Sequence, residues 1–98
     1  MAAIWTHGIW TVKPGREEEF AAAWREMARD ALTECTPRAE PHLLRERERP
    51  NVFRSFGEWD DAETVARFRE YIRPHIERIG ELTESIEFVA LDEVGLDG

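Results

Sequence analysis

Apart from its carboxylates, this chain has few side chains that could move a proton, with 3 histidines and 1 tyrosine among 98 residues. His7 and His75 are the candidate general bases, since histidine has an unperturbed pKa near neutrality. Tyr71 could exchange a proton with a phenolic ligand, and Arg54 could hold an anion. Each histidine and the tyrosine also has a plain structural alternative, as a hydrogen-bonded or half-buried residue without chemistry. His42 is expected where a loop enters a strand, a position that solvent commonly reaches.

Aromatic side chains are frequent, with 4 tryptophans and 5 phenylalanines. A flat apolar wall that binds a small molecule could be built from them. The candidate substrate-binding residues are Trp10, Phe56, Trp59, Phe68 and Ile72. Such stripes also occur as ordinary hydrophobic core, so a binding wall and a core remain two open interpretations.

No motif in the sequence indicates a metal or a cofactor. The histidines show no ligand spacing such as His-x-x-x-His, and Cys35 is the single cysteine, which excludes an internal disulfide and a cysteine-based metal site. Cys35 is expected at a helix end, where the helix dipole disfavours a thiolate. We therefore expect no metal, no bound cofactor and a reducing, cytoplasmic setting.

The charge balance limits the classes of partner. The formal net charge is −8, which disfavours nonspecific binding to nucleic acid and to anionic lipid. No apolar run approaches the roughly 20 residues that a membrane span requires, and residues 1–3 lead directly into a predicted strand. We expect a protein that binds neither nucleic acid nor membrane.

The first elements that must position these residues are a strand and a helix. Residues 4–12 are apolar-rich and predict a strand, which ends at Lys13 because Pro14 fixes its own φ and Gly15 permits a positive φ. Apolar residues at helical spacing then predict an amphipathic helix over 16–34, with three glutamates at its positive end.

A hairpin is predicted next. Runs 42–49 and 52–59 read as strands across a two-residue turn, Pro50-Asn51. If Arg49 pairs with Val52, then Arg47 faces Arg54 and Arg45 faces Phe56, which would gather three guanidinium groups on one sheet face.

A shift of this register by one residue would scatter the arginines. The role of Arg54 as an anion holder depends on the two-residue turn. In the alternative interpretation, residues 45–49 form a charged edge strand that blocks unwanted pairing.

The last elements are a helix and a strand. Asp60 and Asp61 can cap a helix over 62–82, which Pro74 should bend or split. A strand over 86–91 follows. The order β-α-β-β-α-β predicts an α+β fold, a ferredoxin-like sandwich with a four-stranded antiparallel sheet. We expect one domain over residues 1–94 and a C-terminal tail over 95–98.

One face of this sheet would lack a cover. Trp5, Ile9, Trp10 and Phe88 show that neither face of the central strands is fully polar, and the core of a 98-residue chain is small. A second sheet from another subunit should pack there, so the protein itself is an expected partner, as a homodimer.

The chain resembles the antibiotic biosynthesis monooxygenase family. The resemblance covers roughly residues 4–94 and depends on four segments in order: residues 12–20, Glu40-Pro41 before the second strand, Phe53 to Trp59 in the third, and the helix from Ala62. It implies a dimeric α+β barrel made of ferredoxin-like subunits.

The resemblance also implies an activity, cofactor-independent oxidation of an aromatic polyketide-like or quinol-type molecule by O₂. The implied pocket lies between the sheet and the second helix. In this scheme His7 or His75 removes a proton, Tyr71 assists, and Arg54 steadies the anion. The alternative is a small-molecule-binding or assembly module without turnover. A ligand-sized cavity with a histidine in reach favours the enzyme, and a cavity filled by Trp and Phe favours the module.

The chain departs from the family pattern at several positions. It has His42-Leu43 where many relatives have Gly-Cys, and Phe68 where many carry a histidine. Haem-degrading members have asparagine, tryptophan and histidine where this chain has Gly8, Phe68 and Arg78. His75 precedes that last position by three residues and so points about 60° away around a helix. Haem degradation is therefore disfavoured.

Overall fold

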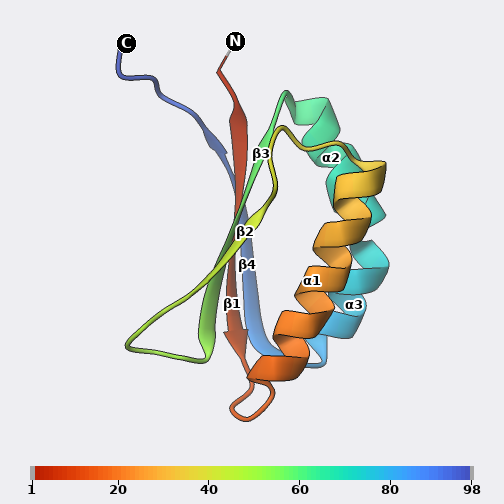
Figure 1. Cartoon of the computed structure of the whole chain (residues 1–98), viewed down its shortest axis with the longest axis vertical. Coiled ribbons are helices and arrows are strands. Elements are labelled where there is room, and N and C mark those ends of the chain that lie inside the picture. The colour runs from red at the N-terminus through yellow and green to blue at the C-terminus, as the bar shows by residue number, and fades with distance from the viewer. Residues whose placement is uncertain (1, 98) are drawn as a thin grey trace.

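A computed structural model describes residues 2–97 of the chain. The elements in chain order are β1 (Ile4–Val12), α1 (Glu17–Glu34), β2 (His42–Arg45), β3 (Val52–Trp59), α2 (Ala62–Tyr71), α3 (Arg73–Gly80) and β4 (Thr83–Asp92). The helices form one layer and the sheet the other (Figure 1). This arrangement confirms the predicted ferredoxin-like α+β fold.

The junction of β1 and α1 follows the local chemistry of the sequence. Gly15 has a φ of 90°, and its N–H donates to Glu17 Oε1 at 2.9 Å. The acidic residues Glu17, Glu18 and Glu19 fill the first turn of α1. The backbone thus uses the one glycine in this turn where an L side chain would be strained.

The second helical segment is split, as predicted. Asp61 caps α2 and accepts from the N–H of Thr64 at 2.8 Å. α2 ends at Tyr71, and α3 begins at Arg73 with Pro74 in its first turn. Proline lacks the N–H that a continuous helix would need at this point, so two short helices replace one long rod.

The four strands lie in the order β2-β3-β1-β4, and all neighbours are antiparallel. Burial alternates along β1, where Trp10 and Val12 are in the core while His7 and Ile9 are only partly buried. One set of β1 side chains therefore faces the helices, and the other set lies on the outer face of the sheet.

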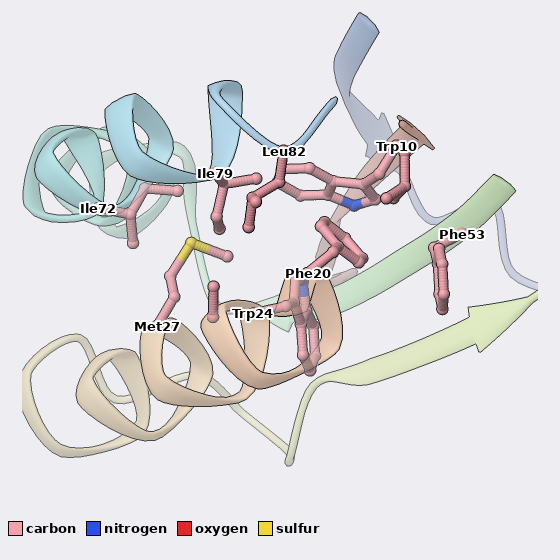
Figure 2. Close-up of a cluster of buried hydrophobic side chains, with 10 residues drawn as sticks. Trp10, Phe20, Trp24, Met27, Phe53, Ile72, Ile79 and Leu82 are labelled. Carbon is pink, nitrogen blue, oxygen red and sulfur yellow. The ribbon is translucent and has the colours of Figure 1, made fainter. Parts of the chain in front are cut away.

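The core lies between the sheet and the helices. Figure 2 shows its labelled members, which come from α1, from α3 and the residues that flank it, and from β1 and β3: Trp10, Phe20, Trp24, Met27, Phe53, Ile72, Ile79 and Leu82. Trp10 and Phe20 are almost fully buried, with relative exposures of 1% and 0%. Burial of these aromatic rings explains why so short a chain carries so many of them.

The predicted register of the hairpin is wrong. β2 ends at Arg45, Leu44 faces Arg54, and Arg45 pairs with Phe53. Residues 46–51 form a loop in place of a two-residue turn, in which the N–H of Glu46 donates to the carbonyl of Val52 at 2.9 Å. The three guanidinium groups are therefore not gathered on one face.

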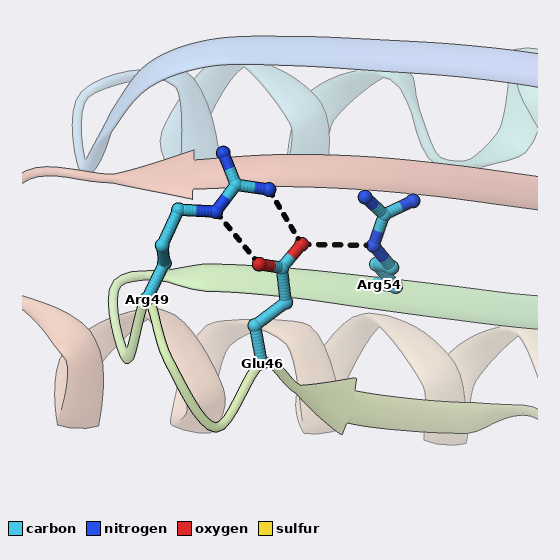
Figure 3. A network of polar contacts seen from close by, with 3 residues as sticks. All are labelled: Glu46, Arg49 and Arg54. Atoms are coloured by element: carbon cyan, nitrogen blue, oxygen red, sulfur yellow. Dashed lines mark hydrogen bonds and ion pairs between the residues drawn. The ribbon is translucent and has the colours of Figure 1, made fainter.

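The Glu46 side chain explains this loop (Figure 3). Its carboxylate accepts from Arg49 at 2.7 and 2.9 Å and from Arg54 at 3.0 Å, so one acidic group joins the loop to β3. Val52 N–H donates to the Arg49 carbonyl at 2.9 Å and closes the loop. Arg54 is thus already paired with a carboxylate.

β4 is also longer than predicted, because it pairs with β1 over its whole length.

Candidate functional site

Two hollows lie between the helices and the sheet. The larger, which we call the groove, has a volume of about 580 Å³ and lies between α2, α3 and β4. Its walls are mostly apolar, with charged side chains among them: Ala62, Val65, Ala66, Arg69, Glu70, Ile72, Arg73, Ile76, Ile86 and Phe88. An apolar floor with nearby cations suits a planar ligand that carries negative charge.

The smaller hollow, which we call the inner cavity, has a volume of about 30 Å³ and lies between α1 and the central strands. Aromatic rings of Trp10, Trp59, Phe68 and Phe88 border it, and residues of α1 such as Met27 close it from the helix side. A cavity needs roughly 10 to 15 Å³ to hold one water, so only a very small molecule fits here.

Two hydroxyl groups also border the inner cavity. Trp10 Nε1 donates to Ser55 Oγ at 2.9 Å, and Trp59 Nε1 donates to Thr6 Oγ1 at 3.0 Å. Both bonds are buried, and among residues 2–97 neither hydroxyl has an acceptor for its own proton. Each hydroxyl can therefore donate to an oxygen atom placed in the cavity.

Glycines allow these two indoles to lie against the sheet. A Cβ on Gly8 would lie 2.6 Å from Trp10 Nε1, and one on Gly57 would lie 2.9 Å from Trp59 Nε1. Because real Cβ atoms do not approach so closely, a larger residue at either position would displace its tryptophan.

The five predicted substrate-binding residues all border one of the two hollows. Trp10, Trp59 and Phe68 border the inner cavity, and Ile72 borders the groove. Phe56 also borders the inner cavity, although its ring is stacked on His7 with centroids 4.6 Å apart.

Two of the predicted catalytic residues lie on the outer face of the sheet. His7 Nε2 is buried and has no hydrogen-bond partner among the residues that the structure describes. Burial lowers the pKa of His7, and the nearby positive charge of Arg54 lowers it further. Arg54 is paired with Glu46 at 3.0 Å. Neither His7 nor Arg54 borders the groove or the inner cavity, which open on the other side of the sheet.

The other two predicted catalytic residues lie on the helices. His75 Nε2 is 3.0 Å from Asp30 Oδ2, which joins α3 to α1. Tyr71 ends α2 with 38% of its surface exposed, and desolvation together with the negative charge of Asp30 raises its pKa. Neither side chain borders the two hollows, so the structure does not bring the four predicted catalytic residues together.

The sequence interpretation missed Thr6, Ser55 and Arg69. A signal for the first two exists, because Thr6-x-Gly8-x-Trp10 and Ser55-x-Gly57-x-Trp59 repeat one pattern in the paired strands β1 and β3. The pattern places a hydroxyl, a glycine and an indole on one strand face.

Arg69 was missed because it is one of many arginines. The structure distinguishes it, since its guanidinium lies 4.9 Å from the centre of the Phe88 ring. Arg73, also on the groove, is paired with Glu70 at 2.7 Å. Arg69 forms no ion pair among the described residues, so its charge is available to a ligand in the groove.

The fold and the hollows define a class of protein: a ferredoxin-like sandwich with an aromatic cavity between its sheet and its helices. Comparison of the sequence with family models then identifies the family. The model of the antibiotic biosynthesis monooxygenase family matches residues 6–78, and the chain belongs to this family. This match confirms the resemblance seen in the sequence. No curated protein matches the chain.

Solved structures share the fold. A conserved protein from Methanosarcina mazei Go1 superposes with a TM-score of 0.86 at 18% identity, over 96% of this chain and 95% of that chain. SnoaB, a cofactor-independent oxygenase from Streptomyces nogalater, superposes with a TM-score of 0.84 at 20% identity, over 97% and 96%. Identities this low establish the shared fold and do not transfer the activity.

Two further properties concern metals and membranes. Within residues 2–97, no group of three or more His, Cys, Asp or Glu side chains is arranged to hold a metal ion. None of the helices in this part of the chain combines the length and apolar character that crossing a bilayer would take.

Proposed function

We propose that this protein is a cofactor-independent monooxygenase that oxidises an aromatic polyketide-like or quinol-type small molecule with O₂. The observation that carries the proposal is the adjacency of an open apolar groove and a small aromatic cavity that contains two hydroxyl donors. Family membership and the structural likeness to SnoaB, a cofactor-independent oxygenase, support the same reaction class.

The substrate would lie in the groove. Its rings would cover the apolar floor formed by residues such as Ile72, Ile76 and Phe88, and its anion would face the guanidinium of Arg69. A nearby positive charge favours the ionised form of a phenol or enol and so lowers its pKa.

The reaction balances without a cofactor. A CH₂ carbon of the ring system loses one proton, and the resulting anion gives one electron to O₂. The two radicals join through a C–O bond, and the peroxide takes up a proton to form a hydroperoxide. Loss of water then leaves C=O, so one oxygen atom enters the product and the other leaves as water.

The inner cavity would take up O₂. Its small volume suits a diatomic molecule, and the hydroxyl protons of Thr6 and Ser55 would stabilise the negative charge that develops on the reduced oxygen. The reduced oxygen, which is far smaller than the substrate, would then pass into the groove and join the substrate radical there.

Proton removal is assigned to solvent acting on an acidic substrate held by Arg69. None of the histidines borders the groove or the inner cavity, and His75 is paired with Asp30. Under this proposal H7A and H75A retain turnover. A loss of turnover in a folded H75A protein would instead favour the predicted general base.

Oxygen uptake tests the activity. 1,8-Dihydroxyanthrone, which has a CH₂ carbon in its central ring, is mixed with the protein in air, without added metal or cofactor, and ¹⁸O₂ labelling follows the oxygen atom into the product. Ser55→Ala should slow uptake on the order of 10²-fold, because it removes one donor to the developing charge. Ser85→Ala removes the same group at an exposed site on β4 and should have no effect.

Uptake that does not exceed the buffer rate with a broad quinol panel would refute the activity. The alternative function is a small-molecule-binding or assembly module without turnover. One observation favours it: Trp and Phe rings fill the walls of the inner cavity, and no histidine lies among them. Ligand binding without oxygen uptake would support this module.

We also propose that a second copy of the chain covers the outer face of the sheet. Leu44, Val89 and Leu91 are exposed there, at 56%, 45% and 43%. Trp5 and Ile9 add partly buried apolar surface beside them. Burial of this face against the same face of a partner would remove apolar area from water. The single free cysteine, Cys35, supports a reducing, cytoplasmic setting for this dimer.

A further inference from the structure

Phe88 stands between the groove and the inner cavity. Among residues 2–97 it is the one residue that borders both hollows. Its ring lies 6.3 Å from that of Phe68, which borders only the inner cavity, and Arg69, which borders only the groove, holds its guanidinium over the Phe88 ring. The side chain therefore has one hollow on each side.

No side chain on the neighbouring strand β1 helps Phe88 to separate the two hollows. The residue of β1 that pairs with Phe88 is Gly8, which has no Cβ. A side chain on Gly8 would collide with Trp10 and Ser55, so this position cannot fill the space in its place. Ile86, two residues earlier on the same face of β4, borders the groove alone. The boundary thus depends on one ring.

We infer that Phe88 determines the size of the ring system that the protein binds, because it prevents a ligand in the groove from reaching the inner cavity. This inference rests on the proposed function in one respect, the assignment of the groove to an aromatic ligand. With Phe88 in place, a ligand covers the groove floor only. With the ring removed, the two hollows merge, and a longer fused system enters the space that Phe88 leaves.

Binding without oxygen tests the inference. The probes are 2-naphthol, with two fused rings, and 1-hydroxypyrene, with four, and their Kd values are measured by fluorescence titration under argon. Phe88→Ala should lower the ratio of the Kd for 1-hydroxypyrene to the Kd for 2-naphthol by about tenfold. A change of this size requires about 60 Å² of additional buried ring surface. Ile86→Ala is the matched control: it widens the groove on the same strand face but leaves the boundary, and the ratio should stay within about twofold.

Phe88→Leu guards against misfolding of the alanine variant, because it keeps an apolar side chain while removing part of the ring. It should shift the ratio in the same direction by a smaller factor. Equal shifts in F88A and I86A, or no shift in F88A and F88L, would overturn the inference. Failure of both probes to bind any variant at millimolar concentration would overturn it too. If the ratio of the two Kd values shifts as predicted but the protein takes up no oxygen in air, only the proposed oxygenase activity is refuted.

Discussion

Gly57→Ala tests whether the paired indoles and hydroxyls require a strand without a side chain at this point. The new Cβ would lie 2.8 Å from Thr6 Oγ1 and 2.9 Å from Trp59 Nε1, so the indole must move and its 3.0 Å hydrogen bond must break. Overpacking costs about 1 to 3 kcal/mol and the lost bond about 1 kcal/mol. Reduced freedom of the unfolded chain offsets about 0.5 to 1 kcal/mol, so we expect a net loss of about 2 kcal/mol.

Urea unfolding, followed by circular dichroism at one fixed protein concentration, measures this loss. Gly80→Ala is the control, because a Cβ there has no neighbour within 4 Å, and α3 should be unchanged or up to about 1 kcal/mol more stable. In a Trp59→Phe background the indole nitrogen is absent, and Gly57→Ala should cost less than half as much. Equal costs in both backgrounds, or a G57A protein as stable as the wild type, would refute the reasoning.

Two further predictions concern the outer face of the sheet. His7→Phe keeps a ring on Phe56 and removes the titrating nitrogens. Since the pKa of His7 in the fold is lowered from 6.5, the unfolded state takes up the proton first, and the wild type should lose stability as pH falls through 6.5 toward that lower value. Thermal melts between pH 8 and pH 5 should show a smaller loss for the variant, and parallel curves would contradict this. Light scattering at micromolar concentration should give a dimer that Leu91→Glu disrupts and that Leu32→Glu, on α1, does not; a monomeric wild type would refute the pairing of sheets.

Local chemistry made most of the fold predictable. Gly15 and Pro14 end the first strand, Asp61 caps the second helical segment, and Pro74 divides it, each through its own backbone preference or hydrogen bond. These effects operate over a few residues and do not depend on the rest of the molecule, so the sequence alone contains them.

The hairpin register was not predictable in this way. Residues 45–49 alternate arginine and glutamate, which fits both an edge strand and a charged loop. The outcome depends on Glu46, whose carboxylate bonds Arg49 within the loop and Arg54 on the next strand. Such a choice depends on three side chains meeting in space, and period-two patterning carries no information about it.

The candidate catalytic residues were predicted from their chemistry alone, without regard to the sheet face on which they lie. The alternation of side chains along a strand supplies this missing information. His7 drew attention because histidine titrates near neutrality, yet a residue at an odd position of β1 must face away from Trp10, and Trp10 is in the core. The same parity puts Thr6 and Gly8 beside Trp10, on the face that borders the inner cavity. Thr6, Gly8 and Trp10, which do not titrate near neutrality, therefore lie on the cavity side of the sheet. His7 lies on the face that we assign to the partner subunit. Under the proposed function, substitutions at the even positions of β1 should therefore change turnover, and substitutions at its odd positions should change dimerisation.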